Sequence, residues 1–383
     1  MDLALSEEQV ALRELAADFV DREVVPHAAE WDRAERVDAG IVPALGKLGF
    51  LGITIDESYG GSGGDHLAYV LMLEELGRGD SSVRGIVSVS LGLVAKTVAG
   101  YGTEEQKRQW LPRLCSGEAL GCFALTEPDT GSDAASLATR ASRDGGDWVL
   151  SGSKIFITNG TWADVALVFA RTGQPGTRGI TAFLVPTDAP GFHRREIHGK
   201  LGLRGQATAE LTLDGVRVPD ANRIGEEGQG FRIAMAALDK GRVSVAAGCV
   251  GIARGCVEHA ISYAGERQQF GRPIAGFQLV QELISEMATE TDAARLLVWR
   301  AAHLIDRGEP FGTAASMAKL FASETAVRAA NHAIQVFGGY GYIDEYPVGK
   351  YLRDARVTTL YEGTSQIQKL LIGRALTGVN AFT

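Results

Sequence analysis

The segment Tyr361-Glu362-Gly363-Thr364-Ser365-Gln366-Ile367-Gln368 places one carboxylate beside a glycine, two hydroxyls and two amides. The β-branched residues of the preceding run, 356–360, favour extended backbone. Ser365 with Gln368 matches a capping box. Helical spacing follows, with apolar positions at Ile367, Leu370, Leu371 and Leu376. Glu362 is therefore expected in a turn just before a helix, where it either complements the helix dipole or acts as a general base.

The composition is that of a globular protein. The 383 residues suffice for two or three domains, with 45% apolar and 22% charged residues. A net charge of −9 without a basic patch argues against nucleic acid as a partner. We identify no apolar run of the roughly 18 residues that span a bilayer. Residues 1–8 lack the features of a signal peptide, so we expect a cytoplasmic protein without a membrane partner.

The four cysteines are expected to be free thiols, mostly in the core. Their spacing fits no zinc site, and a chain of this length needs no disulfide scaffold. They are Cys115, Cys122, Cys249 and Cys256.

Residues 1–118 are predicted to form a helical N-terminal domain. Ser6 with Gln9, and Thr103 with Gln106, match capping boxes that open helices. Between them we expect a second helix that ends near residue 49, a glycine-rich loop at 59–64 and helices at 65–77 and 80–99.

The remaining chain is predicted to form two further domains, so the fold class is multidomain α+β. At 119–225, short β-prone segments separated by turn residues predict an antiparallel β domain. Its strands include 148–150, 155–157, 165–169, 180–185 and 211–213. At 226–383 the helical period returns, and long helices indicate a bundle. These helices are expected at 230–267, 277–307 and 312–337, with a shorter one after Ser365.

Four polar stretches remain after common motifs are excluded. No G-x-G-x-x-G, P-loop, H-E-x-x-H, Cys/His cluster or G-x-S-x-G motif is present, so we predict no Rossmann, metal or hydrolase site. The four are FALTEPDTGSD (123–133), KIFITNG (154–160), RQQFGRP (267–273, with Gln278) and QVFGGYGY (335–342).

Each of these stretches has two readings. The first suits a polar ligand or an ordinary turn. The second ends a strand and most simply forms a hairpin turn. In the third, Arg267 either complements a helix C-terminus or binds phosphate. In the fourth, paired glycines either cap a helix or let a ligand approach the backbone.

In combination and order, these stretches resemble the acyl-CoA dehydrogenase family over essentially the whole chain. The most specific matches are YEGT (361–364), TEP with GSD (126–133) and R-x-x-FG (267–271). The resemblance implies a helical N-terminal domain, a middle β-barrel-like domain and a C-terminal four-helix bundle. The likeness is closest to short-chain members, whereas Ser82-Val83-Arg84 and the tail 373–378 look more like glutaryl-CoA dehydrogenase.

The resemblance implies FAD as the cofactor, between the middle and C-terminal domains. The residues implied to line its flavin and ribityl chain are Phe123, Leu125, Thr126, Gly131, Ser132, Phe156 and Thr158. Those implied to reach the pyrophosphate and adenosine of a neighbouring subunit's FAD are Arg267, Phe270, Gln278, Gln335, Gly338 and Gly339. Thr364 and Gln366 would hold the FAD that Glu362 serves. Phe156 stands where the family commonly has a tryptophan, so stacking is kept but the indole N–H is lost.

The implied reaction is α,β-dehydrogenation of an acyl thioester. Glu362 would take the α-proton, its backbone N–H would bind the thioester oxygen, and the β-hydride would pass to flavin N5. The residues implied to contact substrate are Ser132, Asp239, Arg242, Tyr361 and Gly363. The implied partners are acyl-CoA or an acyl-carrier protein, an electron-transferring flavoprotein as oxidant, and identical subunits in a homotetramer.

Arg84 also has two readings. It lies on a mostly apolar helix face and needs a partner, because burying an unpaired charge is costly. The expected ion-pair partners are Asp80, Glu74 or Glu75. Alternatively, Arg84 binds the distal carboxylate of a glutaryl-type substrate, as the matching arginine does in glutaryl-CoA dehydrogenase.

Two other functions are weighed against the dehydrogenase. A flavin monooxygenase or oxidase on the same fold is one, although such monooxygenases do not need the base at Glu362. A non-catalytic oligomeric scaffold is the other, and the intact cofactor and base positions argue against it.

Overall fold

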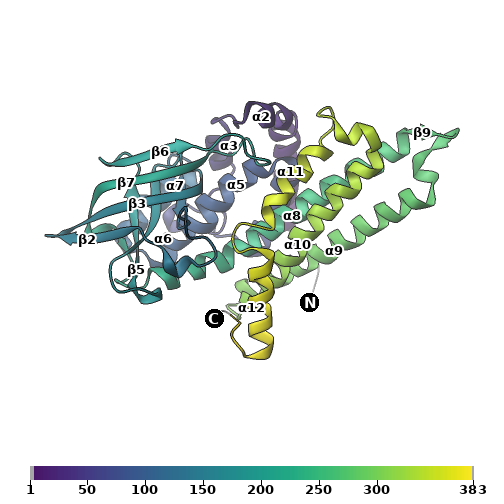
Figure 1. Cartoon of the computed structure of the whole chain (residues 1–383). Coiled ribbons are helices and arrows are strands. Elements are labelled where there is room, and N and C mark those ends of the chain that lie inside the picture. Colours follow the sequence, from purple (N-terminus) through teal and green to yellow (C-terminus); the bar gives the residue numbers. More distant parts are fainter. Residues whose placement is uncertain (1–3, 382–383) are drawn as a thin grey trace.

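The computed structural model describes residues 4–381 and separates into a sheet, a group of short helices and a group of long helices (Figure 1). The sheet lies at one side of the molecule and the long helices lie at the other. The short N-terminal helices pack against both, because α4 lies along α8 and α5 contacts β1. Residues 1–3, which entered the signal-peptide expectation, lie outside the described part of the chain.

The N-terminal part is built from short α-helices, and both predicted capping boxes are confirmed. Ser6 Oγ accepts from Gln9 N at 3.2 Å, and the Gln9 side chain accepts from Ser6 N at 3.0 Å. Thr103 and Gln106 make the same pair of bonds. The helices are α1 (Glu7–Phe19), α2 (Ala28–Ala34), α3 (Ile41–Lys47), α4 (His66–Gly79), α5 (Ser81–Val89), α6 (Lys96–Tyr101) and α7 (Glu104–Ser116), with π-helical turns η1 (Val20–Val24) and η3 (Ser90–Ala95).

The helix predicted at 80–99 is present, but η3 divides it into α5 and α6. This helical stretch, Ser81–Tyr101, is long and apolar enough to cross a membrane by length and composition, which corrects our reading of the sequence. Yet 83% of its most apolar window is buried inside the protein. Its composition is therefore that of a core helix.

The middle part is one sheet in the order β6-β7-β3-β2-β4-β5-β8, with β1 beside β4. The expectation of a wholly antiparallel domain is wrong, because β4 runs parallel to both β1 and β2. Hydrophobic periodicity reports which face a residue takes but not the direction of the strand. The strands are β1 (Gly121–Ala124), β2 (Arg140–Asp144), β3 (Asp147–Thr158), β4 (Val165–Arg171), β5 (Ile180–Pro186), β6 (Phe192–Glu196), β7 (Thr208–Pro219) and β8 (Arg223–Ile224).

The C-terminal part is a bundle in which the long helices α8, α9 and α10 run side by side (Figure 1). Buried alanines such as Ala318, Ala322 and Ala326 allow α10 to approach α8 closely. The helices are α8 (Gly230–Glu266), α9 (Gln278–Asp306), α10 (Gly312–Phe337), α11 (Val348–Thr358) and α12 (Ser365–Thr377); a hairpin of β9 (Gln268–Gln269) and β10 (Arg272–Pro273) joins α8 to α9. The cysteines are free and buried, as predicted.

Two local predictions near Glu362 are wrong. The run 356–360 is not extended but forms the end of α11 and a turn. Its β-branched residues suggested a strand, but Val348, Tyr351 and Ala355 bury one helical face of α11, and this packing overrides propensity. The cap of α12 is Thr364, not Ser365, because the Thr364 side chain accepts from Ile367 N at 3.2 Å.

All three parts of the chain meet at a mostly buried lysine, Lys350. Lys350 Nζ of α11 lies 2.7 Å from Asp80 Oδ2 and 2.6 Å from Asp354 Oδ2. Asp80 is also the N-cap of α5, and Asp354 accepts a hydrogen bond from Leu203 N of the middle part at 2.7 Å. This Lys350 junction fixes α11, and with it the turn that carries Glu362.

Candidate active site

The turn between α11 and α12 holds Glu362 in a left-handed conformation. Glu362 has φ 51° and Gly363 has φ 90°. Two side chains fix this backbone: Lys319 Nζ donates to Gly363 O at 2.8 Å, and Gln368 Nε2 donates to Gly363 O at 3.0 Å and to Glu362 O at 3.2 Å. A non-glycine residue at positive φ persists when its surroundings over-determine it, and such positions cluster at functional sites.

Sequence reasoning missed Lys319 as a site residue. The available signal was a lysine inside the alanine-rich stretch ASMAKLFAS (315–323), where most other positions face the bundle core. Lys319 is itself fully buried, and burial lowers its pKa to about 8. A buried amine at this place needs an acceptor, and the Gly363 carbonyl supplies one.

The Glu362 carboxylate lies in the interior of the protein. Its Oε2 is buried and has no hydrogen-bond partner among residues 4–381. Burial raises the pKa of Glu362 to about 7, whereas Arg84, Lys319 and Arg242 act to lower it. The site therefore combines a base that is half protonated near neutral pH with cations that stabilise its ionised form.

Two glycines of α8 make room for the charged side chains. A Cβ on Gly241 would lie 2.1 Å from Glu362 Oε2 and 2.9 Å from Leu93 Cδ2. A Cβ on Gly248, seven residues later on the same face, would lie 2.8 Å from Arg84 Nε. In the sequence, only the seven-residue spacing of Gly241 and Gly248 indicated that the two glycines share one face of the helix.

The expected ion pair of Arg84 with Asp80, Glu74 or Glu75 is not formed. Those carboxylates bind other cations: Asp80 pairs with Lys350, and both glutamates pair with Arg254. Arg84 is only 2% exposed; its Nη2 donates to Tyr361 Oη at 2.6 Å, and its Nη1 donates to Ser88 Oγ at 3.2 Å. Its Nε has no partner within the described chain. Arg84 thus carries a buried charge without a bound carboxylate, beside the residue that precedes Glu362.

Asp239 and Arg242, predicted to contact substrate, form an ion pair one turn apart on α8. Arg242 is buried, and its Nε has no partner among residues 4–381. Burial lowers the pKa of Arg242, while Asp239 and then Glu362 act to raise it. The structure thus brings Arg242 and Glu362 into one electrostatic environment.

A second group of predicted residues gathers around β1 and β3. Ile155 N donates to Thr126 O at 2.9 Å, which joins the 123–133 and 154–160 stretches side by side. Phe156 has φ 59° and is 65% exposed. Phe123, Leu125 and Thr158 lie on or next to these strands, and Gly131 and Ser132 lie in the loop that follows β1.

The loop after β1 is held by a buried ion pair that sequence reasoning did not identify. Lys154 Nζ, fully buried, lies 2.9 Å from Glu127 Oε1 and donates to Leu125 O at 3.0 Å. The two Glu127 oxygens in turn accept from Ala138 N and Thr139 N. This network fixes the backbone on either side of Thr126.

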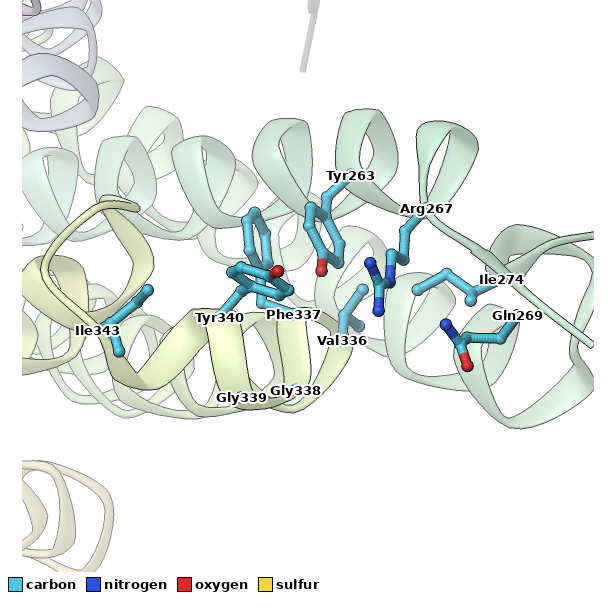
Figure 2. A pocket seen from close by; sticks show the side chains of 10 residues that line it. All are labelled: Tyr263, Arg267, Gln269, Ile274, Val336, Phe337, Gly338, Gly339, Tyr340 and Ile343. Carbon is cyan, nitrogen blue, oxygen red and sulfur yellow. The ribbon is translucent and has the colours of Figure 1, made fainter.

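A third group lies at the far end of the bundle, at a pocket of about 440 Å³ (Figure 2). Figure 2 shows the Arg267 side chain beside Tyr263, with Gly338 and Gly339 on the facing helix end. Phe270, in the adjoining β9–β10 hairpin, is 93% exposed. The pocket is lined by Tyr263, Arg267, Gln269, Ile274, Val336, Phe337, Gly338, Gly339, Tyr340 and Ile343.

A single chain does not bring the second and third groups together. Figure 1 places the β9 hairpin at the end of the bundle opposite to the sheet. Gln278 begins α9 and Gln335 lies near the end of α10, so both belong to the bundle-end group. Thr364 and Gln366 lie at the start of α12, next to the Glu362 turn.

This fold, with a glutamate carboxylate packed against α8 of the bundle, is that of flavin-dependent oxidoreductases that act on acyl-CoA. The chain belongs to the acyl-CoA dehydrogenase family. Models of the family's N-terminal, middle and C-terminal domains match residues 6–118, 122–216 and 228–377. The predicted family and fold class are confirmed.

Individual relatives cover nearly the full chain. An acyl-CoA dehydrogenase of Bacillus subtilis (strain 168) is 46% identical over 98% of this chain and 99% of its own length. Butyryl-CoA dehydrogenase of Megasphaera elsdenii is 42% identical with a TM-score of 0.96, over 98% of this chain and 100% of that one. A glutaryl-CoA dehydrogenase of Mycobacterium smegmatis in complex with FADH2 is 38% identical with a TM-score of 0.95, over 99% and 97%.

Proposed function

We propose that the protein catalyses the FAD-dependent α,β-dehydrogenation of a short-chain acyl thioester to the 2,3-enoyl thioester, with Glu362 as the base. The observation that carries this proposal is the Glu362 carboxylate, whose Oε2 is buried and unpartnered among residues 4–381 and whose pKa is raised to about 7. A base works best when its pKa lies near the operating pH. Butyryl-CoA dehydrogenase among the similar structures supports the short acyl chain.

The same turn supplies the oxyanion contact. The backbone N–H of Glu362 makes no hydrogen bond within the described residues, so it is available to the thioester oxygen. Lys319 and Gln368 hold the turn rigid, which keeps this donor in place without reorganisation during the reaction. Ser132, Asp239, Arg242, Tyr361 and Gly363 would complete the contacts to the substrate.

The residues around β1 and β3 fit a flavin, and those at the bundle end fit its nucleotide part. A Cβ on Gly131, Gly338 or Gly339 would meet no atom within 4 Å, so these backbones are open to a ligand. The exposed ring of Phe156 offers a stacking surface. Phe123, Leu125, Thr126, Ser132, Thr158, Thr364 and Gln366 would complete the flavin site. When bound, FAD supplies the acceptor for the β-hydride.

The separation of the two groups supports a shared site between subunits. Arg267, Phe270, Gln278, Gln335, Gly338 and Gly339 would bind the nucleotide part of a neighbouring subunit's FAD. A homotetramer, cytoplasmic location and reoxidation by an electron-transferring flavoprotein are part of this proposal. So is the domain division 1–118, 119–225 and 226–383, which is supported by the changes of element type after α7 and after β8.

One observation favours a second substrate class, a dicarboxylyl thioester of the glutaryl type. Arg84 is buried beside Tyr361 and is bound to two hydroxyls rather than to a carboxylate. A distal carboxylate would supply the missing counter-charge. The similarity to a glutaryl-CoA dehydrogenase supports this alternative.

The test is a panel of butyryl-CoA, glutaryl-CoA and acyl-carrier-protein thioesters, with flavin bleaching as the readout and an artificial electron acceptor for turnover. Bleaching by butyryl-CoA with slow reoxidation by oxygen is the expected result. Rapid reaction of the reduced enzyme with oxygen would identify an oxidase instead. A purified protein that is colourless and free of FAD would contradict the proposal and favour the scaffold.

A further inference from the structure

Of the three cations that act on the Glu362 carboxylate, one is bonded to the turn that carries it. Lys319 Nζ of α10 donates to Gly363 O at 2.8 Å, and the Lys319 side chain has no exposed surface. The other two cations bond elsewhere: Arg84 to two hydroxyls, and Arg242 to a carboxylate one turn earlier on α8. Lys319 therefore links the position of the base to a buried charge beside it.

Helix α10 also holds the other end of the same turn. Five residues after Lys319, Glu324 Oε1 accepts from Ser365 Oγ at 2.6 Å. The turn is thus attached to α10 at two points, on either side of Thr364. Because α10 packs along both α8 and α9, these bonds anchor the turn to the centre of the bundle.

The Lys319 ammonium keeps its proton over the range in which Glu362 loses one. Burial lowers the pKa of Lys319 to about 8, which is still above the pKa of about 7 for Glu362. A positive charge is therefore present beside the carboxylate while it ionises.

The other titratable and charged groups around this pair come from several elements. Those that face Lys319 are Cys249 and Arg242 of α8, Glu324 of α10 and Glu362 itself. Those that face Glu362 are Arg84 of α5, Lys319 of α10, Arg242 of α8, Tyr69 of α4 and the preceding Tyr361. Burial raises the pKa of both tyrosines and of the thiol, so these three groups are uncharged near neutral pH.

We propose that Lys319 is a positioning residue for the reaction, which fixes the turn of the base and supplies a buried positive charge that favours the ionised carboxylate. The inference rests on the proposed function, in which Glu362 takes the α-proton. Lys319 acts on the substrate only through the carboxylate and the backbone N–H of Glu362. Because a nearby cation lowers the pKa of a carboxyl group, removal of this ammonium should raise the pKa of Glu362.

A matched pair of variants separates the charge from the hydrogen bond. Lys319→Met and Gln368→Met each remove one donor to Gly363 O and leave the other donor in place. Only the first removes a positive charge, whereas the second disturbs the turn at least as much, because Gln368 also donates to Glu362 O. The measurement is kcat/KM for butyryl-CoA across the pH range, with FAD content and melting temperature recorded for each variant.

We expect the pH midpoint of kcat/KM to rise by about one unit or more for Lys319→Met, the usual effect of removing an opposite charge close to a carboxylate. Gln368→Met should keep the wild-type midpoint. The plateau at high pH should fall by about tenfold in both variants, since each turn loses a hydrogen bond. The two variants should therefore differ most near pH 7 and converge above the raised midpoint.

Lys319→Gln keeps an N–H donor and removes the charge, so it should share the raised midpoint, and it tests the charge if the methionine variant loses FAD. A wild-type midpoint in the Lys319 variants would overturn the inference, as would equal shifts in Lys319→Met and Gln368→Met. Loss of FAD from both Lys319 variants would make the residue structural and would overturn it too. Failure of the proposed function is distinguishable, because acyl thioesters would then not bleach the flavin of the wild-type enzyme at any pH.

Discussion

At the scale of single residues, the site depends on one carboxylate held where water cannot stabilise its charge. Glu362→Gln keeps the shape of the side chain and removes the base. FAD and acyl-CoA should still bind, while turnover falls by about 10²–10⁴-fold or more, the usual contribution of a general base. Stopped-flow flavin reduction measures this directly. Near-normal reduction by the variant would refute the role of Glu362.

The pKa of Glu362 fixes the direction of the pH dependence. Only the ionised carboxylate accepts a proton, and its pKa is raised to about 7. For the free enzyme, kcat/KM should therefore rise with pH, level off above about pH 7, and fall about tenfold per unit well below it. A kcat/KM profile from pH 5 to 9 with a non-sticky substrate tests this. A profile that is flat down to pH 5 would show that burial does not raise this pKa.

Arg84 decides between the two substrate classes. If it binds a distal carboxylate, Arg84→Ala should cost roughly 1.5–3 kcal/mol in kcat/KM for a dicarboxylyl thioester, the contribution of a charged hydrogen bond. Butyryl-CoA turnover should be unchanged or improved, so butyryl-CoA is the internal control. A wild-type enzyme that prefers butyryl-CoA over glutaryl- and succinyl-type thioesters would make Arg84 structural.

At this scale, the sequence could single out a candidate site residue when its sequence neighbours were distinctive. It could not identify the residues that contact that residue in the folded structure. Glu362 was singled out because an acid between an aromatic and a glycine precedes a helix, and the family resemblance then implied its role as the base. The partners of Arg84 could not be found, because Asp80 is bound by Lys350, which lies 270 positions later in the chain. Lys319 and Lys154 were missed because buried lysines look like surface lysines in a sequence.

At the scale of elements, α8 contains one glycine that touches the site, Gly241, and one that touches nothing, Gly265, so the two can be compared by the same substitution. Gly241→Ala would place a Cβ 2.1 Å from Glu362 Oε2, so it should displace the carboxylate and lower flavin reduction by about tenfold or more. Gly265→Ala is the control, because a Cβ there meets no atom within 4 Å and the position is exposed. It should keep full activity and raise the free energy of unfolding by up to about 1 kcal/mol.

Equal activity of these two variants would show that the Glu362 carboxylate does not need the gap at Gly241.

Elements with a long helical period were located from the sequence to within a few residues, because α8, α9 and α10 bury a continuous face. The short helix α11 was not, since its β-branched end is typical of a strand and only packing against α8 and α10 makes it helical.

At the scale of the whole molecule, the bundle-end pocket is expected to join subunits through FAD. Arg267→Ala should lower both the FAD content and the fraction of tetramer, because a bidentate phosphate contact is lost. Arg300→Ala, at an exposed arginine near the C-terminal end of α9, is the control. Absorbance at 450 nm and light scattering after gel filtration measure the two quantities. A monomer that retains full FAD would contradict the shared site.

The Lys350 junction has a consequence for how the protein unfolds. Asp80, Leu203 and Asp354 come from the three parts of the chain, and the Lys350 ammonium pairs with both carboxylates. Separating the N-terminal part would take Asp80 from Lys350, and separating the middle part would take the Leu203 N–H from Asp354. Each separation removes a partner from a charged group, which costs free energy. Fraying of one part should therefore release the others. We therefore expect heat to melt the three parts in one cooperative transition, which differential scanning calorimetry would record as a single peak.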